Sequence, residues 1–335
     1  MKKGIRAVRA EWTAVRRQVA FLSLIILVLA LPSWAADKPY PENTDKVIMP
    51  WAVGSTGDLG GRTIADRMTE FFGQPLVFEH RPGAGAVLGV SFGAKAKPDG
   101  YTVVYASSSP LLLAPIVKKV DYKFDDFIHV RIFGKTVNWL AVRSDARWKS
   151  LREFIDEEKK SPGKLKISSY GRQTPGEFVI DLVSKFEGIK LTLIPFKSGV
   201  DALPPLLGGH VDAAIVPGTG GMLDSGQIRM LAVAEENRLP DYPNIPTFTE
   251  LGYPIVTPPG RYWYCFPKGT PKECVDKFSA AHEMAVKRYA KEITGSLKKL
   301  EMWAEFLSRE ETLIRLKKDA EMYLKVVHEL GVVEK

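Results

Sequence analysis

Short apolar segments alternate with longer amphipathic segments along most of the chain. Residues 59–73 place Ile64, Met68 and Phe71 on one face of a helix, and Gly73 suits the C-terminal end of that helix. The order of strand, polar loop and helix then recurs. It predicts strands at 46–51, 75–80, 101–106, 138–143, 164–169, 191–196, 211–216, 228–234 and 261–266, and helices at 59–73, 85–97, 150–160, 178–188, 271–291 and about 309–330.

This alternation predicts an α/β fold in which mostly parallel sheets are flanked by helices. The ligands of such folds bind beyond the carboxyl ends of the strands. Two polar loops lie at that end of a predicted strand, GSTGD at 54–58 and SYGRQTPG at 169–176. We expect the two loops to come from two different sheets and to face each other.

The first 35 residues have the pattern of a secretory signal peptide. A basic start is followed by an unbroken apolar run at 19–32, and then by Ser33, Trp34 and Ala35, with small residues at the two positions that matter for cleavage. This order predicts a cleaved leader and a mature periplasmic chain that starts near Ala36. An uncleaved membrane anchor is the alternative interpretation.

Length and charge narrow the class of protein. The 335 residues suit one large domain or two of medium size. The net charge is +8, but the leader carries six basic residues and one acidic residue, so the mature chain keeps 41 basic and 38 acidic residues. It has no basic cluster typical of a nucleic-acid patch, and we expect no nucleic-acid partner. The two cysteines, Cys265 and Cys274, would form a disulfide in the periplasm or remain as buried thiols.

Residues 82–89 (PGAGAVLG) come close to the glycine pattern of a dinucleotide site. The next strand ends at Ala106 without the acidic residue that would bind the ribose, so we interpret Gly83, Gly85 and Gly89 differently. They let the chain turn tightly and the following helix pack closely. The sequence also lacks P-loop, nucleophile-elbow and zinc-ligand patterns. We therefore expect no cofactor, no metal site and no catalytic residue.

The loop GSTGD suits an anion. A loop at a helix N-terminus presents unpaired N–H groups and the positive end of the helix dipole, and here Ser55 and Thr56 add hydroxyl donors. A carboxylate fits such a site as well as a phosphate does. Asp58 would either cap the helix or accept a hydrogen bond from an ammonium or hydroxyl group of the ligand.

The order of these motifs resembles the exported solute receptors of tripartite tricarboxylate transporters, the Bug or TctC family. Each segment is weak alone, but together they are specific. The segments that carry the resemblance run from about residue 46 to residue 275 and are PWAVGSTGD, QPLVFEHRPGAGAVLG, KPDGYTVVYASSS, SPGKLKISSYG, LIPFKSGVDALPPLLGGHVDAA, LAV followed by IPTFTELGY, and FPKGTP.

The resemblance implies a two-lobed periplasmic-binding-protein fold of the Venus-flytrap type. One domain would combine residues 37–140 with 255–335, and the other would be 141–254. The protein would be a monomeric receptor, not an enzyme, that binds a small carboxylate between the lobes and delivers it to membrane permease subunits. The ligand-binding positions that carry over are Gly54, Ser55, Thr56, Asp58, Ser107, Ser108, Ser109, Tyr170, Gly171 and Thr174.

Three positions depart from the family pattern. Val216-Pro217 stands where the family often has a polar residue after the VDAA strand. Ser55 stands where the family usually has a second glycine, which makes the first loop stiffer, and Arg172 adds a cation to the second loop. Arg172 is either a further ligand for a carboxylate or a solvent-facing loop residue. Because one fold serves several functions, the alternatives are a sensory protein that acts on a membrane kinase and an exported enzyme.

Overall fold

The computed structural model describes residues 40–218, 221–253 and 257–332. The predicted leader and the predicted domain boundary at 255 therefore lie outside the described residues. Residues 43–335 make up one compact unit, and the description below concerns that unit.

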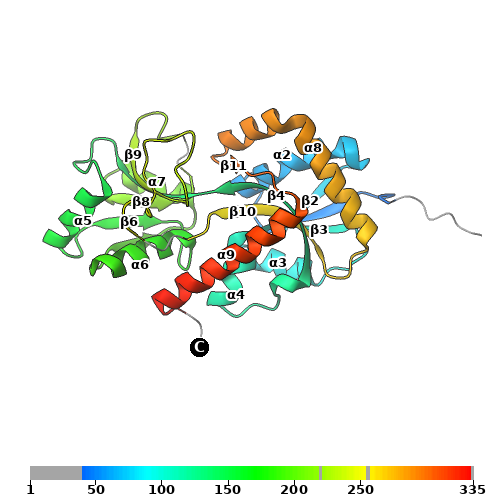
Figure 1. The fold of residues 1–335 in the computed structure, drawn as a ribbon, viewed down its shortest axis with the longest axis horizontal. Helices are drawn as coiled ribbons and strands as arrows, with labels where there is room; N and C mark the ends of the chain where they lie inside the picture. The colour runs from blue at the N-terminus through cyan, green and yellow to red at the C-terminus, as the bar shows by residue number, and fades with distance from the viewer. Residues whose placement is uncertain (1–39, 219–220, 254–256, 333–335) are drawn as a thin grey trace, which may run out of the picture. The chain divides into compact units, whose positions relative to one another are not determined.

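Two β-sheets form the framework of the unit (Figure 1). Within the described residues, the first sheet has six strands in the order β11-β4-β10-β3-β1-β2, and the second has five in the order β7-β6-β8-β5-β9. The strands of the first sheet are β1 (Asp45–Met49), β2 (Leu76–His80), β3 (Thr102–Ser107), β4 (Phe127–Thr136), β10 (Gly260–Pro267) and β11 (Trp303–Ala304). Those of the second are β5 (Asn138–Arg143), β6 (Lys166–Ser169), β7 (Thr192–Pro195), β8 (Ala213–Val216) and β9 (Ile228–Ala234).

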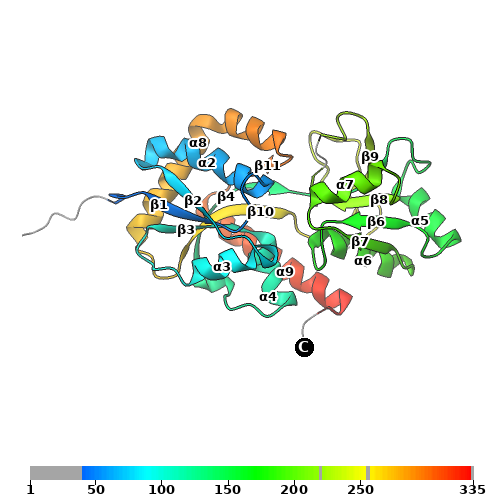
Figure 2. The same ribbon diagram turned by 180° about the vertical axis from the view of Figure 1, so that it is seen from behind.

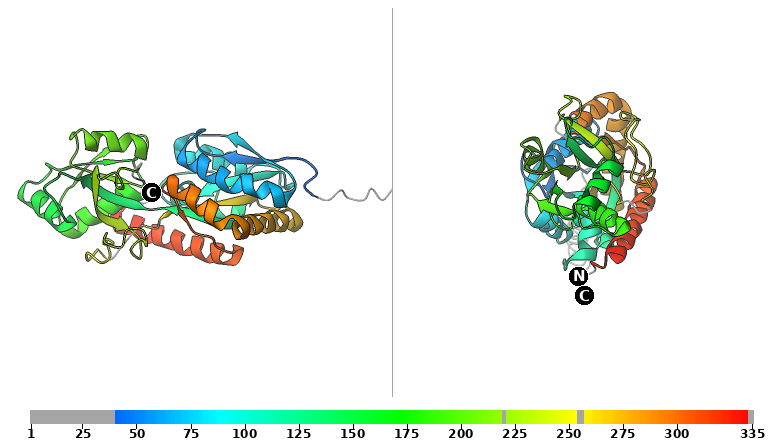
Figure 3. Two further views of the ribbon diagram at one scale, coloured as in Figure 1. Left: turned by 90° about the horizontal axis from the view of Figure 1, so that it is seen from above. Right: turned by 90° about the vertical axis from the view of Figure 1, so that its left-hand side faces the viewer.

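Helices cover both sheets. The described helices are α2 (Thr56–Phe72), α3 (Val87–Ala94), α4 (Ala114–Val117), α5 (Leu151–Lys160), α6 (Pro175–Glu187), α7 (Gly199–Leu207), α8 (Lys272–Lys299) and α9 (Arg309–Leu330). α5, α6 and α7 surround the second sheet (Figure 2), whereas α2 and α8 lie side by side on the first (Figure 3). α9 packs against β4 and also contacts α6.

The predicted α/β class is confirmed, but both sheets are mixed rather than mostly parallel. β1 is parallel to β2 and β3, and β6 is parallel to β7 and β8. β10 is antiparallel to β3 and β4, and β5 is antiparallel to β8 and β9. The chain passes between the sheets at Val137 and returns before Gly260, so β5 and β10 are the strands that follow these passages. Two consecutive parallel strands need a crossover connection, usually a helix, between them. In the described part of the chain no helix directly precedes β5 or β10, and both strands run antiparallel to their neighbours.

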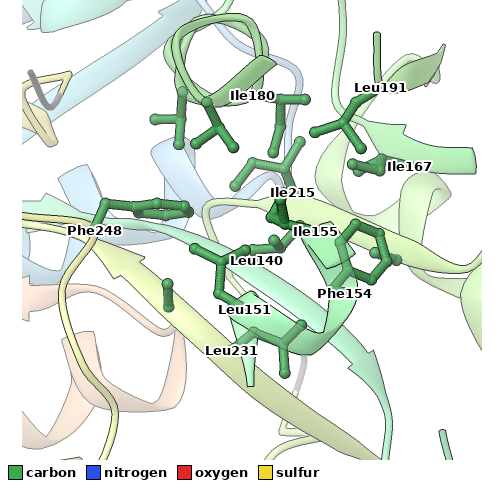
Figure 4. Packing of buried hydrophobic residues seen from close by; sticks show 14 of the residues in the cluster. Leu140, Leu151, Phe154, Ile155, Ile167, Ile180, Leu191, Ile215, Leu231 and Phe248 are labelled. Atoms are coloured by element: carbon green, nitrogen blue, oxygen red, sulfur yellow. The ribbon is translucent and has the colours of Figure 1, made fainter. Parts of the chain in front are cut away.

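The second sheet has a hydrophobic core on each face. Because side chains alternate along a strand, Leu140 and Ile215 point to one face, and Trp139 and Val216 point to the other. α5 and α6 close the first face, where Phe154 packs among aliphatic side chains (Figure 4), and α7 closes the second. Helices therefore pack against both faces of the sheet that carries the loop after β6.

The same alternation orders β10 in the first sheet. Trp263 and Cys265 belong to the core beneath α9. The neighbouring Tyr264 packs instead against Phe278 of α8, with ring centroids 5.4 Å apart. Tyr262 is two residues from Tyr264 and therefore points to the face of the sheet that α2 and α8 cover.

The glycines of residues 83–89 have the structural role that we predicted. Gly83 and Gly85 have φ angles of +140° and +67°, in the region that side-chain-bearing residues rarely adopt. A β-carbon at Gly89 would lie 2.8 Å from the carbonyl oxygen of Arg81 and from Cα of Pro50. The glycines therefore let the chain turn and let α3 approach the end of β1 closely.

Both cysteines are buried free thiols, which decides between the two alternatives for this structure. Burial raises the pKa of the Cys265 thiol and of the Cys274 thiol, so the reactive thiolate is disfavoured at both positions.

None of the helices described is both long enough and apolar enough to cross a membrane. The described residues also contain no group of three or more His, Cys, Asp or Glu side chains that could hold a metal ion.

Candidate ligand-binding site

The first polar loop leads directly into α2. The helix begins at Thr56, three residues earlier than the apolar pattern predicted, and Ser55 is its N-cap. The Ser55 hydroxyl oxygen accepts a hydrogen bond from the backbone N–H of Asp58 at 3.3 Å. In the described residues the backbone N–H groups of Thr56 and Gly57 have no hydrogen-bond partner, as is usual for the first turn of a helix. Two backbone donors and two hydroxyl groups are therefore available at this end of α2.

Asp58 stabilises the loop from inside the protein. Its side chain is only 1% exposed and accepts hydrogen bonds from Gly54 N–H at 2.9 Å and Arg62 Nε at 3.0 Å, and His80 Nε2 lies 2.9 Å from it. Burial by itself would raise the pKa of this carboxyl, but the Gly54 N–H, His80 and Arg62 outweigh burial and lower the pKa. The geometry matches the helix-capping alternative, although Ser55 is the N-cap and Asp58 lies in the first turn.

The second polar loop has the same construction at the start of α6. Thr174 is the N-cap, and its hydroxyl oxygen accepts a hydrogen bond from Glu177 N–H at 3.3 Å. Glu177, three residues after the cap, accepts a hydrogen bond from Gln173 N–H, just as Asp58 accepts one from Gly54. Each loop is thus held by a hydroxyl at the cap and by an acidic residue that reaches back to the residue before it.

The two helix ends differ in the donors that they leave available. The first residue of α6 is Pro175, which has no N–H group, and the Gly176 N–H donates to the Tyr170 hydroxyl oxygen at 3.1 Å. The Thr174 hydroxyl donates to the Gly171 carbonyl oxygen at 3.1 Å. The Thr174 hydroxyl proton is therefore already used. The Tyr170 hydroxyl is the donor that the second loop leaves available, whereas α2 offers backbone N–H groups as well.

Arg172 is exposed and already paired. Its side chain is 66% exposed, and its guanidinium donates to Glu177 Oε1 at 2.7 Å. Of the two alternatives for Arg172, this structure has the solvent-facing loop residue, with its charge balanced by Glu177.

The three predicted serines lie at the end of β3, next to β10. Ser107 pairs with Tyr262 in the antiparallel ladder, and the Ser108 hydroxyl oxygen accepts a hydrogen bond from Arg261 N–H at 3.0 Å. Ser107 and Ser108 are buried, whereas Ser109 is partly exposed. Ser109 is therefore the serine of this group that is best placed to reach a ligand.

Tyr262 lies beside the first polar loop, although no sequence motif points to it. Its ring centroid is 6.2 Å from that of Trp51, and Trp51 packs against Gly57 in the first turn of α2. The structure therefore brings a residue of β10 next to the start of α2.

A cavity of about 190 Å³ lies elsewhere in the molecule. Its lining includes the aromatic side chains of Trp139, Tyr242 and Trp303 and, at the C-terminal end of α8, Lys298. None of the predicted ligand-binding residues is part of this lining. The hydrogen-bonding groups described above, and not this cavity, therefore define the candidate site.

Comparisons with known proteins agree on one family. Residues 61–324 match the model of the tripartite tricarboxylate transporter family receptor. The chain is 29% identical to the "UPF0065 protein in gbd 5'region" of Cupriavidus necator, over 81% of this chain and 83% of that protein. It is also 29% identical to protein BugT of Bordetella pertussis, over 76% of this chain and 79% of that protein.

Solved structures have the same fold. A periplasmic transporter superposes with a TM-score of 0.76 at 28% identity and covers 88% of this chain and 99% of its own. Rpa4515 of Rhodopseudomonas palustris, determined with adipate, has a TM-score of 0.76 at 24% identity, and the match covers 88% of this chain and 99% of Rpa4515. These structures and that of the periplasmic binding protein BugD, with a TM-score of 0.75 at 24% identity, share the two-lobed periplasmic-binding-protein fold. The chain belongs to the tripartite tricarboxylate transporter receptors, a family of periplasmic solute-binding proteins.

Proposed function

We propose that the mature protein, from near Ala36 onward, is a periplasmic receptor that binds a small organic carboxylate and delivers it to a tripartite tricarboxylate-type permease. The single observation that carries the proposal is the start of α2, where the Thr56 and Gly57 N–H groups stand unpaired beside the Ser55 and Thr56 hydroxyls. Such an arrangement stabilises an anion through hydrogen bonds and the helix dipole, without a basic side chain.

We assign the predicted residues to two roles. Those that would contact the carboxylate or its water shell lie at the exposed parts of the loops, and they are Gly54, Ser55, Thr56, Ser109, Tyr170, Gly171 and Thr174. Asp58, Ser107 and Ser108 are buried, and they would position the loops from behind.

We further propose that the lobes are residues 37–140 with 255–335, and residues 141–254, and that they close on the ligand. The two passages of the chain between the sheets support this division. Two structural relatives, Rpa4515 with adipate and MatC with malate, support a carboxylate as the ligand class. Delivery to a permease is inferred from the family description.

The test is titration calorimetry on the mature chain with adipate, malate and benzoate, each paired with its amide. We expect at least one acid to bind, with its amide at least tenfold weaker, because the amide lacks the charge that the helix end stabilises. Mass spectrometry of molecules that co-purify with the protein should identify a carboxylic acid. A co-purified ligand without a carboxyl group, or an amide that binds as tightly as its acid, would contradict the proposal.

A further inference from the structure

Three partly exposed aromatic rings surround the candidate site. Trp51 lies at the first loop, Tyr170 belongs to the second, and Tyr262 of β10 packs against Trp51. These rings come from three separate segments of the chain and are brought together by the fold. Large aromatic side chains that are neither fully buried nor scattered over the surface are typical of the walls of ligand sites.

A buried aromatic layer holds this wall in place. Tyr105 is fully buried and stacks on Tyr262, with ring centroids 6.0 Å apart and an interplanar angle of 28°. It also meets the edge of Trp51 at 5.6 Å and packs against Tyr264 at 5.6 Å. Since Tyr105 is fixed by these contacts, the rings in front of it are already ordered before a ligand arrives, which favours affinity.

Two cations near the loops are already engaged by the protein's own side chains. Arg172 is paired with Glu177 and is 66% exposed. Arg62 donates to Asp58, and its guanidinium lies 4.5 Å from the centre of the Phe78 ring. A third cation, Lys197, is exposed and follows Phe196, whose N–H donates to the Ser169 carbonyl oxygen at 2.7 Å. The aromatic rings, and not the charges, therefore indicate the ligand class.

We propose that the ligand of this site is an aromatic carboxylate. Its carboxylate would accept hydrogen bonds at the start of α2, and its ring would stack against Tyr262 and Trp51. Aromatic rings prefer offset-stacked or edge-to-face contacts with other rings, so such a wall favours a flat ring over a saturated one of similar size. The proposal names the ligand class of the site described above, and so it rests on the proposed function.

The test compares three acids on the mature chain by calorimetry: benzoate, cyclohexanecarboxylate and adipate. Benzoate should bind at least threefold more tightly than cyclohexanecarboxylate, which has the same charge and a similar size, and more tightly than adipate. Tyr262→Leu should weaken benzoate binding about three- to tenfold, the size expected for one aromatic contact, with a smaller effect on adipate.

Two further variants separate stacking from folding. Tyr262→Phe keeps the ring and should keep benzoate affinity within about twofold. Tyr289→Leu removes a partly exposed tyrosine of α8, whose hydroxyl donates to Glu70, and should leave benzoate affinity unchanged.

The outcomes distinguish the two proposals. If cyclohexanecarboxylate or adipate binds as tightly as benzoate, the aromatic ligand class is wrong and the carboxylate receptor stands. If Tyr262→Phe loses as much benzoate affinity as Tyr262→Leu, the stacking contact is wrong. If none of the three acids binds and a ligand without a carboxyl group co-purifies, the receptor proposal itself fails.

Discussion

Removing the charge of Asp58 should destabilise the protein through the first loop. The carboxylate is almost fully buried and joins the Gly54 N–H, Arg62 and His80. Asp58→Ala removes all three contacts, and breaking a buried ionic contact costs about 3–5 kcal/mol. Arg62 is 38% exposed and His80 is 17% exposed, so water can solvate both once the carboxylate is gone. We therefore expect Asp58→Ala to lower the free energy of unfolding by about 2–4 kcal/mol. Asp58→Asn keeps one acceptor oxygen and should lower the free energy of unfolding by about 1–3 kcal/mol.

The assay is urea unfolding of the mature chain at several pH values. Asp66→Asn is the matched control, because Asp66 lies on the same helix and is exposed, and it should change stability by less than about 0.5 kcal/mol. The folded-state pKa of Asp58 is lowered, so its stabilisation is present above the unfolded pKa of about 3.9 and is lost as pH falls through the folded pKa. The difference between wild type and Asp58→Asn should therefore be full at pH 7 and shrink below pH 4. If Asp58→Asn is as stable as Asp66→Asn at pH 7, this reasoning is refuted.

Three other measurements, two on variants and one on the wild-type protein, test the structure away from the first loop. Burial, and after it the charge of Glu177, raise the pKa of Asp181 to about 6, so the charged form of Asp181 opposes folding as pH rises through 6. In urea unfolding, Asp181→Asn should therefore be about 1–2 kcal/mol more stable than wild type at pH 8 and equal to it at pH 4. Arg261→Met leaves the buried Asp319 carboxylate without its partner and should lower the free energy of unfolding by about 3–5 kcal/mol; a loss below 1 kcal/mol would contradict the pairing. Titration with a thiol reagent should find no reactive cysteine in the native protein and two in urea without a reductant, whereas none in urea would indicate a disulfide.

The periodic parts of the fold could be predicted from the sequence. The strand at 138–143 and the helix at 309–330 have the predicted bounds, because each shows a regular pattern of apolar positions. β4 was missed, although it is a long interior strand of the first sheet, between β11 and β10. Its polar side chains hide the pattern: His129 is 2% exposed, and its Nδ1 accepts a hydrogen bond from Trp263 Nε1 at 3.0 Å. A partner more than a hundred residues away satisfies this histidine, and no local pattern shows that.

The candidate site was predictable to a similar extent. The polar loops were identified because their glycine and hydroxyl residues follow strands directly. The burial of Asp58 could not be predicted, because its partner His80 lies on β2 and only the parallel pairing of β1 with β2 brings the two together. Tyr262 was missed for the same reason, since its neighbours Trp51 and Tyr105 come from distant parts of the chain.

The central claim is that hydroxyl groups of both loops hold the ligand's carboxylate. The most direct test is calorimetry of Ser55→Ala and Tyr170→Phe with the tightest-binding acid of the panel and with its amide. Each hydroxyl that donates to a charged group contributes about 1.5–3 kcal/mol, so each variant should bind the acid about ten- to a hundredfold more weakly.

Ser150→Ala is the matched control, because the Ser150 hydroxyl caps α5 in the same way as Ser55 caps α2 but lies outside the site. Its affinity for the acid should equal that of wild type. The account predicts that Ser55→Ala and Tyr170→Phe each weaken acid binding at least tenfold and amide binding less than threefold. Equal losses for acid and amide, or no loss for the acid in either variant, would contradict it.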